Sequence, residues 1–362
     1  MKMHNSSLQT TALLASYALM AVLSATAAGQ EQKLPNVTIL ATGGTIAGTA
    51  AAATQVAGYT SAKVPVEQLI DAVPDLKKVA NVKGEQVAQV ASESMTNEVW
   101  LKLAKRINVL LAQQDVDGIV VTHGTDTLEE TAYFLNLVVK SAKPVVLVGA
   151  MRPSTAISAD GPFNIYNGVA VAASKASAGR GVLVSLNDQI NGARDVTKMN
   201  TMTVDTFRAP DFGLVGYVVG GQPQFYRTST RKHTTETEFD VTNVETLPAV
   251  DIVYGYANMN RIPLDAFVAA GDKGIIHAGV GDGSLAAQVK PALIEIRKKG
   301  VIIVRSSRTG GGPVVRNGEA NDDDLDFVVS DTLSPQKARI LLMLALTKTN
   351  NTKEIQRMFY TY

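Results

Sequence analysis

Short, continuously apolar segments alternate along this chain with longer segments whose apolar residues recur at a helical spacing. Over residues 97–114, for example, Val99, Leu103 and Ile107 fall on one helical face. Further helices are expected over 127–142 and 161–178. The apolar segments between the helices are NVTILATGG from residue 36, DGIVVTHGTDT from 117, KPVVLVGAMRP from 143 and GRGVLVSLND from 179. Such an alternation predicts a parallel sheet with helices on both faces.

A second set of such elements begins near residue 250. Strands followed by turns are expected in VDIVYGYAN, GIIHAGVGDGS and GVIIVRSSRTGGG. Helices are expected in SLAAQVKPALIEIRKKG and SPQKARILLMLALTKT, with Ser284 and Ser334 as their N-caps. The polar, threonine-rich segment between the two sets has no apolar helical face. We therefore expect two α/β domains: a larger N-terminal parallel-sheet domain with flavodoxin-like winding (33–225), a linker (226–247) and a smaller C-terminal domain (248–362).

The first residues of the chain have the pattern of a secretory signal peptide. Lys2 precedes an uncharged run whose apolar centre, 12–23, is shorter than the roughly 20 residues that a membrane span needs. Ala25 and Ala27 fit the small-x-small pattern of a cleavage site. We expect residues 1–27 to be a signal peptide and the mature protein to be periplasmic. A membrane anchor and a disordered tail are the alternatives.

Composition and charge exclude several classes of function. The 362 residues carry a net charge of +1, from 34 basic and 33 acidic residues, whereas a nucleic-acid or anionic-membrane partner would require a basic face. The chain has no cysteine, which excludes disulfides, thiolate zinc sites and cysteine nucleophiles. Only four histidines are present, which argues against a histidine-rich metal centre. We expect neither a metal nor a cofactor.

Three of the expected strands end in polar turns, and ligands of open parallel α/β sheets bind beyond these carboxyl ends. The turns are residues 42–45, 123–127 and 149–152. A phosphate-binding loop would require a lysine after the glycines of the first turn, and a dinucleotide-binding motif would require the spacing G-x-G-x-x-G. Neither follows the first strand. The segment 279–283 lacks the final spacing, and we expect it to form a tight turn.

The first two turns contain residues that suit acyl transfer. A threonine hydroxyl, from Thr45 or Thr125, becomes a nucleophile when a base removes its proton. Gly43 and Gly44 remove side-chain bulk, so that backbone amides could hold an oxyanion. Asp126 adjoins Thr125 and could bind a substrate ammonium group or orient a catalytic chain.

The base that such chemistry requires is left open by the residues alone. His123 and Lys198 are both candidates, since burial can lower the pKa of a lysine enough for it to accept a proton. Taken alone, Lys198 is typical of a solvated loop lysine. The threonines also have structural alternatives: Thr45 as a helix cap, and Thr125 with Asp126 as capping residues, since Glu129 follows Asp126 at capping-box spacing.

Six motifs occur in one order along the chain: ILATGGTIAG, VASESMTNEVW, DGIVVTHGTDTLEETAYFL, VVLVGAMRP, SADGPFNIYNGVAVA and ARDVTKMNT. Together they resemble the bacterial type II L-asparaginases, in particular the glutaminase-asparaginase branch. The resemblance covers about residues 33 to 362. The two threonine motifs are highly specific to that family.

The resemblance implies catalytic roles for five residues. Thr45 would be the primary nucleophile, and Tyr59 would belong to a mobile loop that closes over the site. Thr125, Asp126 and Lys198 would form a second catalytic group, in which a buried Lys198 activates a hydroxyl or water. Whether Thr45 forms a covalent acyl-enzyme or water attacks directly stays open.

The resemblance also implies how an amino-acid amide would be held. Ser92 and Glu93 would hold the α-carboxylate and α-amine, the Gly44 turn would form the oxyanion site, and the Ala150 carbonyl would face the leaving nitrogen. Asn258 and Glu319 would complete the site of a neighbouring subunit in a homotetramer, a dimer of tight dimers. The expected reaction hydrolyses L-asparagine and L-glutamine to aspartate or glutamate plus ammonia. An exported amino-acid-binding protein without catalysis is the main alternative, and a cytoplasmic type I asparaginase is another.

Overall fold

The structure, a computed structural model, describes residues 33–362. The predicted signal peptide, 1–27, therefore lies outside the described residues. From Pro35 to Tyr362 the chain forms one compact unit. No helix of the described residues combines the length and the apolar character needed to cross a membrane.

The larger sheet has eight strands in the order β10-β9-β6-β5-β4-β3-β1-β2. Its first five strands pair in parallel in the order 2-1-3-4-5, which is the flavodoxin-like winding that was predicted. In this winding the strand order reverses between β1 and β3, and the crevice at the carboxyl ends of these two strands is the expected ligand site. The five strands are β1 Asn36–Gly43, β2 Asn81–Val90, β3 Gly118–Thr122, β4 Val145–Val148 and β5 Val182–Leu186.

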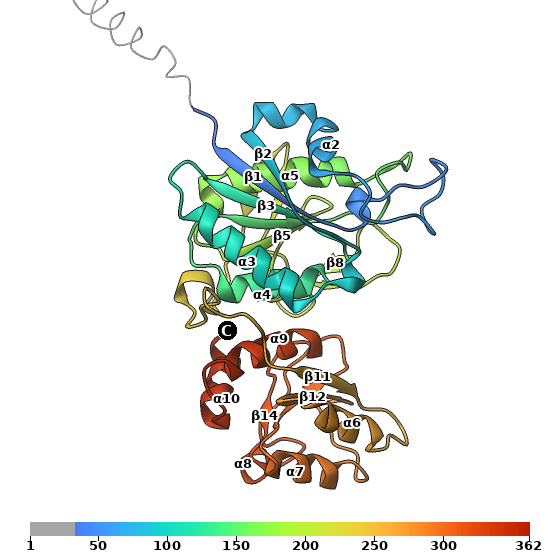
Figure 1. Ribbon diagram of the computed structural model, residues 1–362, viewed down its shortest axis with the longest axis vertical. Coiled ribbons are helices and arrows are strands. Elements are labelled where there is room, and N and C mark those ends of the chain that lie inside the picture. The colour runs from blue at the N-terminus through green and yellow to red at the C-terminus, as the bar shows by residue number, and fades with distance from the viewer. Residues whose placement is uncertain (1–32) are drawn as a thin grey trace, which may run out of the picture. The chain divides into compact units, whose positions relative to one another are not determined.

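Helices cover both faces of this sheet, because its central strands are apolar on both sides (Figure 1). Val120 of β3 belongs to the same buried cluster as residues of α2 and α5, whereas the next residue, Val121, belongs to a cluster with residues of α3 and α4. All five residues of β3 are buried, as expected for a parallel strand between two helical layers. The four helices are α2 Val66–Asp71, α3 Asn97–Leu111, α4 Leu128–Val138 and α5 Gly161–Ala173.

Short antiparallel strands extend the larger sheet beyond β5, and the hydrophobic pattern did not predict them. Strands of two or four residues contain too few positions to show a period, and most of these alternate between buried and exposed side chains. A separate two-stranded ribbon, β7 with β8, carries Lys198. These strands are β6 Gln189–Gly192, β7 Thr197–Lys198, β8 Phe207–Arg208, β9 Gly216–Val219 and β10 Gln222–Phe225.

The smaller sheet has four parallel strands in the order β11-β12-β13-β14, which confirms the second α/β domain. Helices α6 and α7 pack on one face, and α9 packs on the other. The strands are β11 Val250–Tyr254, β12 Gly274–Gly279, β13 Ile302–Ser307 and β14 Val328–Val329. The helices are α6 Ile262–Ala270, α7 Lys290–Lys298, α8 Asp322–Leu325, α9 Pro335–Leu346 and α10 Thr352–Thr361.

Of the two serine N-caps predicted for the second domain, Ser334 is confirmed in its position and Ser284 was wrong. Helix α7 begins at Lys290 with Val289 as its N-cap, while Ser284 pairs with Val280 across the turn formed by the glycines of 279–283. Ser334 does occupy the N-cap position of α9, but its hydroxyl makes no capping hydrogen bond. The tight turn predicted at 279–283 is present.

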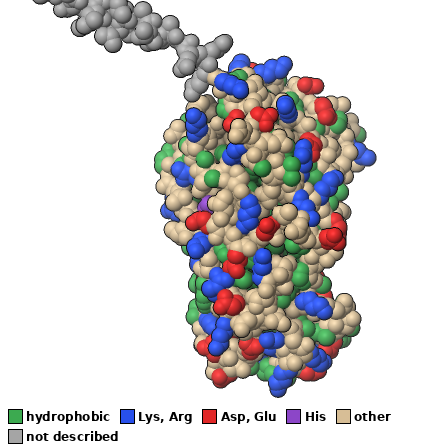
Figure 2. All heavy atoms as spheres, turned by 60° about the vertical axis from the view of Figure 1, so that its left-hand side comes forward, with side chains coloured by type: hydrophobic (Ala, Val, Ile, Leu, Met, Phe, Trp, Pro, Cys, Tyr) green, Lys and Arg blue, Asp and Glu red, His purple; other side chains and the backbone are tan. Residues whose placement is uncertain are grey.

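The two sheets share a continuous apolar core. Helix α9 of the second domain packs against α4 of the first, and Leu341 and Leu344 belong to the same buried cluster as Phe134 and Leu137. Between β10 and β11 the chain forms one 3-10 turn, Thr234–Glu236, and no strand. The domain boundaries 33–225, 226–247 and 248–362 stay a prediction. On the face shown in Figure 2, basic and acidic side chains are interspersed, in keeping with the near-zero net charge.

Candidate active site

The two glycine turns that the sequence singled out meet backbone to backbone at the switch point between β1 and β3. Gly44 has a φ of 80°, and a Cβ on it would lie 2.2 Å from both Cα and N of Gly124. Because no side chain fits there, the turns that carry Thr45 and Thr125 can approach each other closely. Gly44 N donates to Val90 O at 3.0 Å, so an oxyanion role in this turn falls to the amide of Thr45.

We predict that Gly44→Ala both destabilises the protein and lowers its catalytic rate, because the added methyl group forces the two turns apart. The matched control is Gly179→Ala: Gly179 also has a positive φ, 70°, but a Cβ there meets no atom within 4 Å. That control should cost only the roughly 1 kcal/mol of an unfavourable left-handed conformation. Thermal unfolding and initial rates of both variants check this, and equal losses in the two would contradict the proposed close contact.

A cavity of about 430 Å³ opens over the two turns. Eight of the predicted site residues line it, from five separate stretches of the chain: Gly44, Thr45, Tyr59, Ser92, Glu93, Thr125, Asp126 and Lys198. Ala150 is fully buried and does not line the cavity, but Met151 and Arg152 directly after it do. Asn258 and Glu319 are exposed and, within this chain, are not among the described residues lining the cavity.

Thr45 faces the cavity and does not act as a helix cap. It opens the 3-10 helix Thr45–Ala47, whose N-cap is Gly44 without a side-chain hydrogen bond. Its Oγ1 lies 2.8 Å from the hydroxyl of Tyr59. The loop that carries Tyr59 is closed at its base by the pairing of Thr49 with Thr60. It also docks on the segment after β4, where Ser154 and Ile157 donate to backbone carbonyls of the loop region.

Thr125, Asp126 and Lys198 form one hydrogen-bonded group. Lys198 Nζ donates to Thr125 Oγ1 at 2.9 Å and to Asp126 Oδ1 at 2.6 Å. Thr125 is buried, whereas the side chain of Asp126 is 59% exposed toward solvent. The Lys198 side chain is 17% exposed, so the expectation of a buried lysine is only partly met. The lysine bridges a sheltered hydroxyl and a carboxylate that a ligand can reach.

His123, the alternative base, is a structural residue. It is fully buried, its Nδ1–H donates to Gly124 O at 2.7 Å, and its Nε2 accepts from Thr131 Oγ1 at 2.8 Å. Trp100 Nε1 in turn donates to Thr131 Oγ1 at 2.7 Å. Burial lowers the pKa of His123 to about 4, so the ring is neutral near pH 7. The geometry therefore leaves Lys198 as the base candidate.

Ser92 ties the loop after β2 to the Thr125 turn. Its Oγ accepts from Asp126 N at 3.2 Å, and its carbonyl accepts from Thr127 Oγ1 at 2.8 Å. Its neighbour Glu93 is exposed at the cavity wall. The Glu93 and Asp126 carboxylates, with the cations of Lys198 and Arg152, give the cavity charges of both signs. A zwitterionic ligand would find partners for both of its charges here.

Sequence reasoning missed the residues that hold the third turn in place. Asp160 accepts from the backbone N–H groups of Met151 and Arg152, both at 3.0 Å. Asn164 Nδ2 donates to Gly149 O at 3.0 Å. Both residues lie in the motif SADGPFNIYNGVAVA, but from the sequence alone a polar residue at the start of a helix is interpreted as a helix cap. Only the fold shows that these side chains point back to the turn after β4.

Glu129 was interpreted as a capping-box partner of Asp126, and that alternative is wrong. Helix α4 begins at Leu128 with Thr127 as its N-cap and has no side-chain capping bond. The Glu129 carboxylate instead accepts hydrogen bonds from the Lys198 main chain and from Gln336. No sequence signal connects these three residues, because they are separated by 69 and 207 positions.

Fold and site together define a class of protein: a two-domain α/β protein with two threonine hydroxyls and a lysine in a cavity at the switch point of its larger sheet. Within residues 33–362 no three His, Cys, Asp or Glu side chains are grouped so as to hold a metal ion. The groups that the described cavity offers are hydroxyls, an amine, a guanidinium and carboxylates. These suit attack on a neutral carbonyl of a small zwitterion.

Comparison with known proteins agrees with this class along nearly the whole chain. Residues 36–231 match the family model described as asparaginase, N-terminal, and residues 249–359 match the glutaminase/asparaginase C-terminal domain. The glutaminase-asparaginase of Pseudomonas fluorescens biotype A is 55% identical over 331 residues, which cover 91% of each chain. The L-asparaginase 2 of Escherichia coli (strain K12) is 54% identical over 334 residues, 92% of this chain and 95% of that protein.

A solved structure agrees as well. The crystal structure of a probable cytoplasmic L-asparaginase from Campylobacter jejuni has a TM-score of 0.89 and 48% sequence identity. The match covers 91% of this chain and all of that one, 100%. The chain therefore belongs to the asparaginase family, which confirms the resemblance found in its motifs. This membership makes it an enzyme and favours catalysis over the alternative of a binding protein.

Proposed function

We propose that this protein hydrolyses the side-chain amides of L-asparagine and L-glutamine, releasing ammonia and L-aspartate or L-glutamate. One observation carries the proposal: the hydroxyls of Thr45 and Thr125 line one cavity, and Lys198 is hydrogen-bonded to the second of them. A solute-binding protein needs neither a hydroxyl pair nor a lysine in this position. The glutaminase-asparaginase name of the Pseudomonas fluorescens relative supports activity on both amides.

The cavity matches the three polar groups of such a substrate. Ser92 serves the α-carboxylate, and the carboxylates of Asp126 and Glu93 serve the α-ammonium. The neutral amide then lies between Thr45 and Thr125, with the Thr45 amide available for the developing oxyanion. The charged groups of the substrate would thus be bound at one end of the cavity, and its uncharged amide would react at the other.

In the proposed reaction Thr45 Oγ1 attacks the amide carbon while its hydroxyl is held by Tyr59. The carbon–nitrogen bond breaks, and the nitrogen leaves as ammonia with the proton that Thr45 gives up. Water then attacks the acyl group, and Thr45 regains a proton as the acid is released. The group of Thr125, Lys198 and Asp126 takes up and returns protons through Thr125, while Asp126 holds the lysine in place.

An ammonia-release assay with L-asparagine, L-glutamine and their D-forms tests this function. We expect comparable initial rates on the two L-amides. Negligible glutamine turnover with normal asparagine turnover would contradict the dual specificity. Absence of ammonia from every amide, in a protein that binds asparagine, would contradict hydrolysis and support the binding-protein alternative.

We further propose that the mature protein works in the periplasm as a homotetramer built from tight dimers. The leader pattern of residues 1–27 supports export. The exposure of Asn258 and Glu319 on the second domain supports a role for both in the cavity of a neighbouring copy. Light scattering measures the mass of the assembly, and N-terminal sequencing of protein from the periplasmic fraction locates the cleavage. A monomer that retains full activity would contradict the shared site.

A further inference from the structure

The carboxylate of Glu129 joins three elements behind the Thr125 turn. Glu129 lies in the first turn of α4 and is buried, with 4% of its surface exposed. Its Oε2 accepts from Lys198 N at 2.6 Å, and its Oε1 accepts from Gln336 Nε2 at 2.6 Å. Lys198 belongs to the ribbon β7–β8, and Gln336 to the first turn of α9 in the second domain. Each oxygen of one buried carboxylate is thus used by a different donor.

The other contacts that fix the ribbon lie on either side of Lys198. Lys337 Nζ donates to the Val196 carbonyl before it, and Asn200 N donates to Thr206 Oγ1 at 3.0 Å after it. Strand β7 has two residues and pairs only with β8, so Lys198 lies opposite Phe207, and Met199 N donates to Thr206 O at 2.8 Å. The Lys198 N–H points away to Glu129, and a hydrogen bond to an ionised acceptor is about twice as strong as a neutral one. Among the described contacts, Glu129 is therefore the partner that holds the Lys198 N–H itself.

The position of that main chain determines what the lysine amine can reach. Lys198 Nζ must bridge Thr125 Oγ1 and Asp126 Oδ1 at hydrogen-bond distance at the same time. A displacement of about 1 Å at the backbone breaks one of these contacts, and such displacements can cost about a hundredfold in rate. Glu129 does not line the cavity, and its direct link to a residue that does is the hydrogen bond from Lys198 N.

We propose that Glu129 is a positioning residue for catalysis. Glu129, itself hydrogen-bonded by Gln336, holds the Lys198 main chain so that the Lys198 amine contacts Thr125 and Asp126 at the same time. The second domain then supports the chemistry of its own subunit through Gln336. This inference rests on the proposed function, because it assigns Lys198 a part in turnover.

An exchange of the two side chains tests the proposal. In Glu129→Gln, the amide offers one acceptor oxygen to two donors, so either Lys198 N or Gln336 Nε2 faces its NH₂ group. In Gln336→Glu, two carboxylates face each other. In the double variant, the amide oxygen at position 129 again accepts from Lys198 N, and its NH₂ group donates to the new carboxylate at 336. Both hydrogen bonds are restored with the original net charge.

We expect each single variant to lower kcat at least tenfold with KM changed less than threefold, because Ser92 and Glu93 are untouched. The double variant should return kcat to within about threefold of the wild type. Glu130→Gln is the matched control, since it changes the adjacent glutamate, which has no hydrogen bond to Lys198 among the described contacts. Burial raises the pKa of Glu130 to about 7, so a neutral amide imitates a form that it already adopts, and kcat should stay within twofold.

Deuterium exchange at the Lys198 amide gives a readout that does not depend on activity. It should be faster in Glu129→Gln and return to the wild-type rate in the double variant. A single variant with kcat within twofold of the wild type, or a double variant no better than the singles, would overturn the proposal. If the wild type releases no ammonia, the proposed function fails, whereas unchanged Lys198 exchange in Glu129→Gln would refute the positioning role by itself.

Discussion

Replacing Thr45 with alanine is expected to lower kcat for asparagine by about a thousandfold or more while KM changes less than about threefold. In the proposed reaction the removed hydroxyl attacks the amide carbon, so its loss should act on the transition state and leave the contacts of Ser92, Glu93 and Asp126 intact. Removal of a nucleophile from a catalytic group costs far more than removal of an orienting side chain.

The comparison with Thr45→Ser separates the hydroxyl from the methyl group of threonine. The serine variant keeps a nucleophile beside Tyr59 and should retain far more activity than the alanine variant. The midpoints of thermal unfolding of both variants should match that of the wild type, since Thr45 Oγ1 bonds only to Tyr59 among the described contacts. Substantial activity in Thr45→Ala would remove Thr45 from the role of nucleophile.

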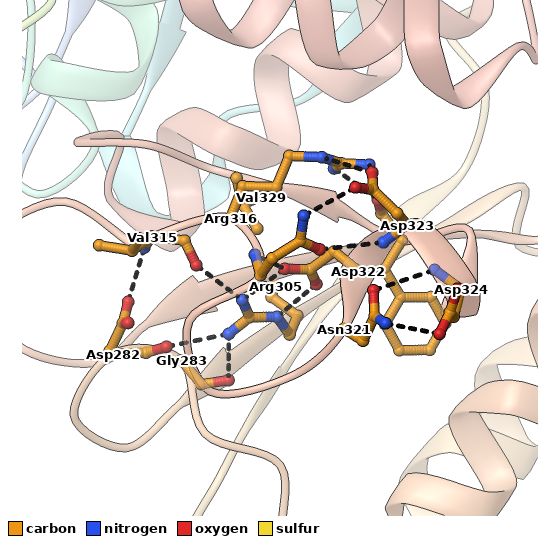
Figure 3. A network of polar contacts seen from close by, with 12 residues as sticks. Asp282, Gly283, Arg305, Val315, Arg316, Asn321, Asp322, Asp323, Asp324 and Val329 are labelled. Carbon is orange, nitrogen blue, oxygen red and sulfur yellow. Dashed lines mark hydrogen bonds and ion pairs between the residues drawn. The ribbon is translucent and has the colours of Figure 1, made fainter.

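The largest expected effect on stability comes from Arg305, which is fully buried in the second domain (Figure 3). Its guanidinium donates to both oxygens of Asp322, at 2.6 and 2.7 Å, and neither side chain has any exposed surface. It also donates to the carbonyls of Asp282, Gly283 and Val315, between 2.9 and 3.2 Å. One cation thus fixes two loops and an acidic helix start.

Arg305→Met is expected to lower the free energy of unfolding by about 3–5 kcal/mol, because it leaves the buried Asp322 carboxylate without its cation. The buried carbonyl of Gly283 and the part-buried carbonyls of Asp282 and Val315 also lose their donor. Chemical denaturation of the active protein measures this loss. Arg261→Met is the control: Arg261 also pairs with carboxylates, Asp265 and Glu295, but in solvent, and its loss should leave the unfolding midpoint nearly unchanged. Similar losses in both variants would contradict the role of burial.

The Arg305 network also bears on the assembly. Val315 N donates to Asp282 at 2.7 Å, and Asn317 N donates to Asp322 at 2.8 Å. The loop just before Glu319 is thus hydrogen-bonded to two separate carboxylates. If Glu319 serves the cavity of a neighbouring copy, its loop must be held in one position. Arg305 variants that stay folded but loosen this loop should therefore turn over asparagine and glutamine more slowly than the wild type.

The sequence was sufficient to locate the centre of the site. Apolar strands that end in polar turns placed Thr45 and Thr125 at one sheet edge, and the absence of a lysine after Gly44 excluded a phosphate loop. Both arguments depend only on local pattern and on the rule for parallel sheets. Lys198 was different, since its importance came from the resemblance and its position depends on a two-residue ribbon that no periodicity reveals.

The supporting residues could not be predicted, because their partners are remote in sequence and their own local signals favour another interpretation. Glu129 has the spacing of a capping box, yet it bonds to Lys198 and Gln336. Ser284 precedes an apolar stretch like a helix cap, yet Gly281 and Gly283 bend the chain into a turn there. Tertiary contacts decide both cases, and a single sequence does not display them.

The most direct test of the account is a crystal structure of the wild-type protein with L-aspartate bound. The account predicts the side-chain carboxyl of aspartate within hydrogen-bond distance of both Thr45 Oγ1 and Thr125 Oγ1, with the α-carboxylate at Ser92 and the α-amine at Asp126. Aspartate bound elsewhere, for instance in the separate cavity lined by Arg194, Arg308 and Lys337, with the threonine cavity empty, would contradict it.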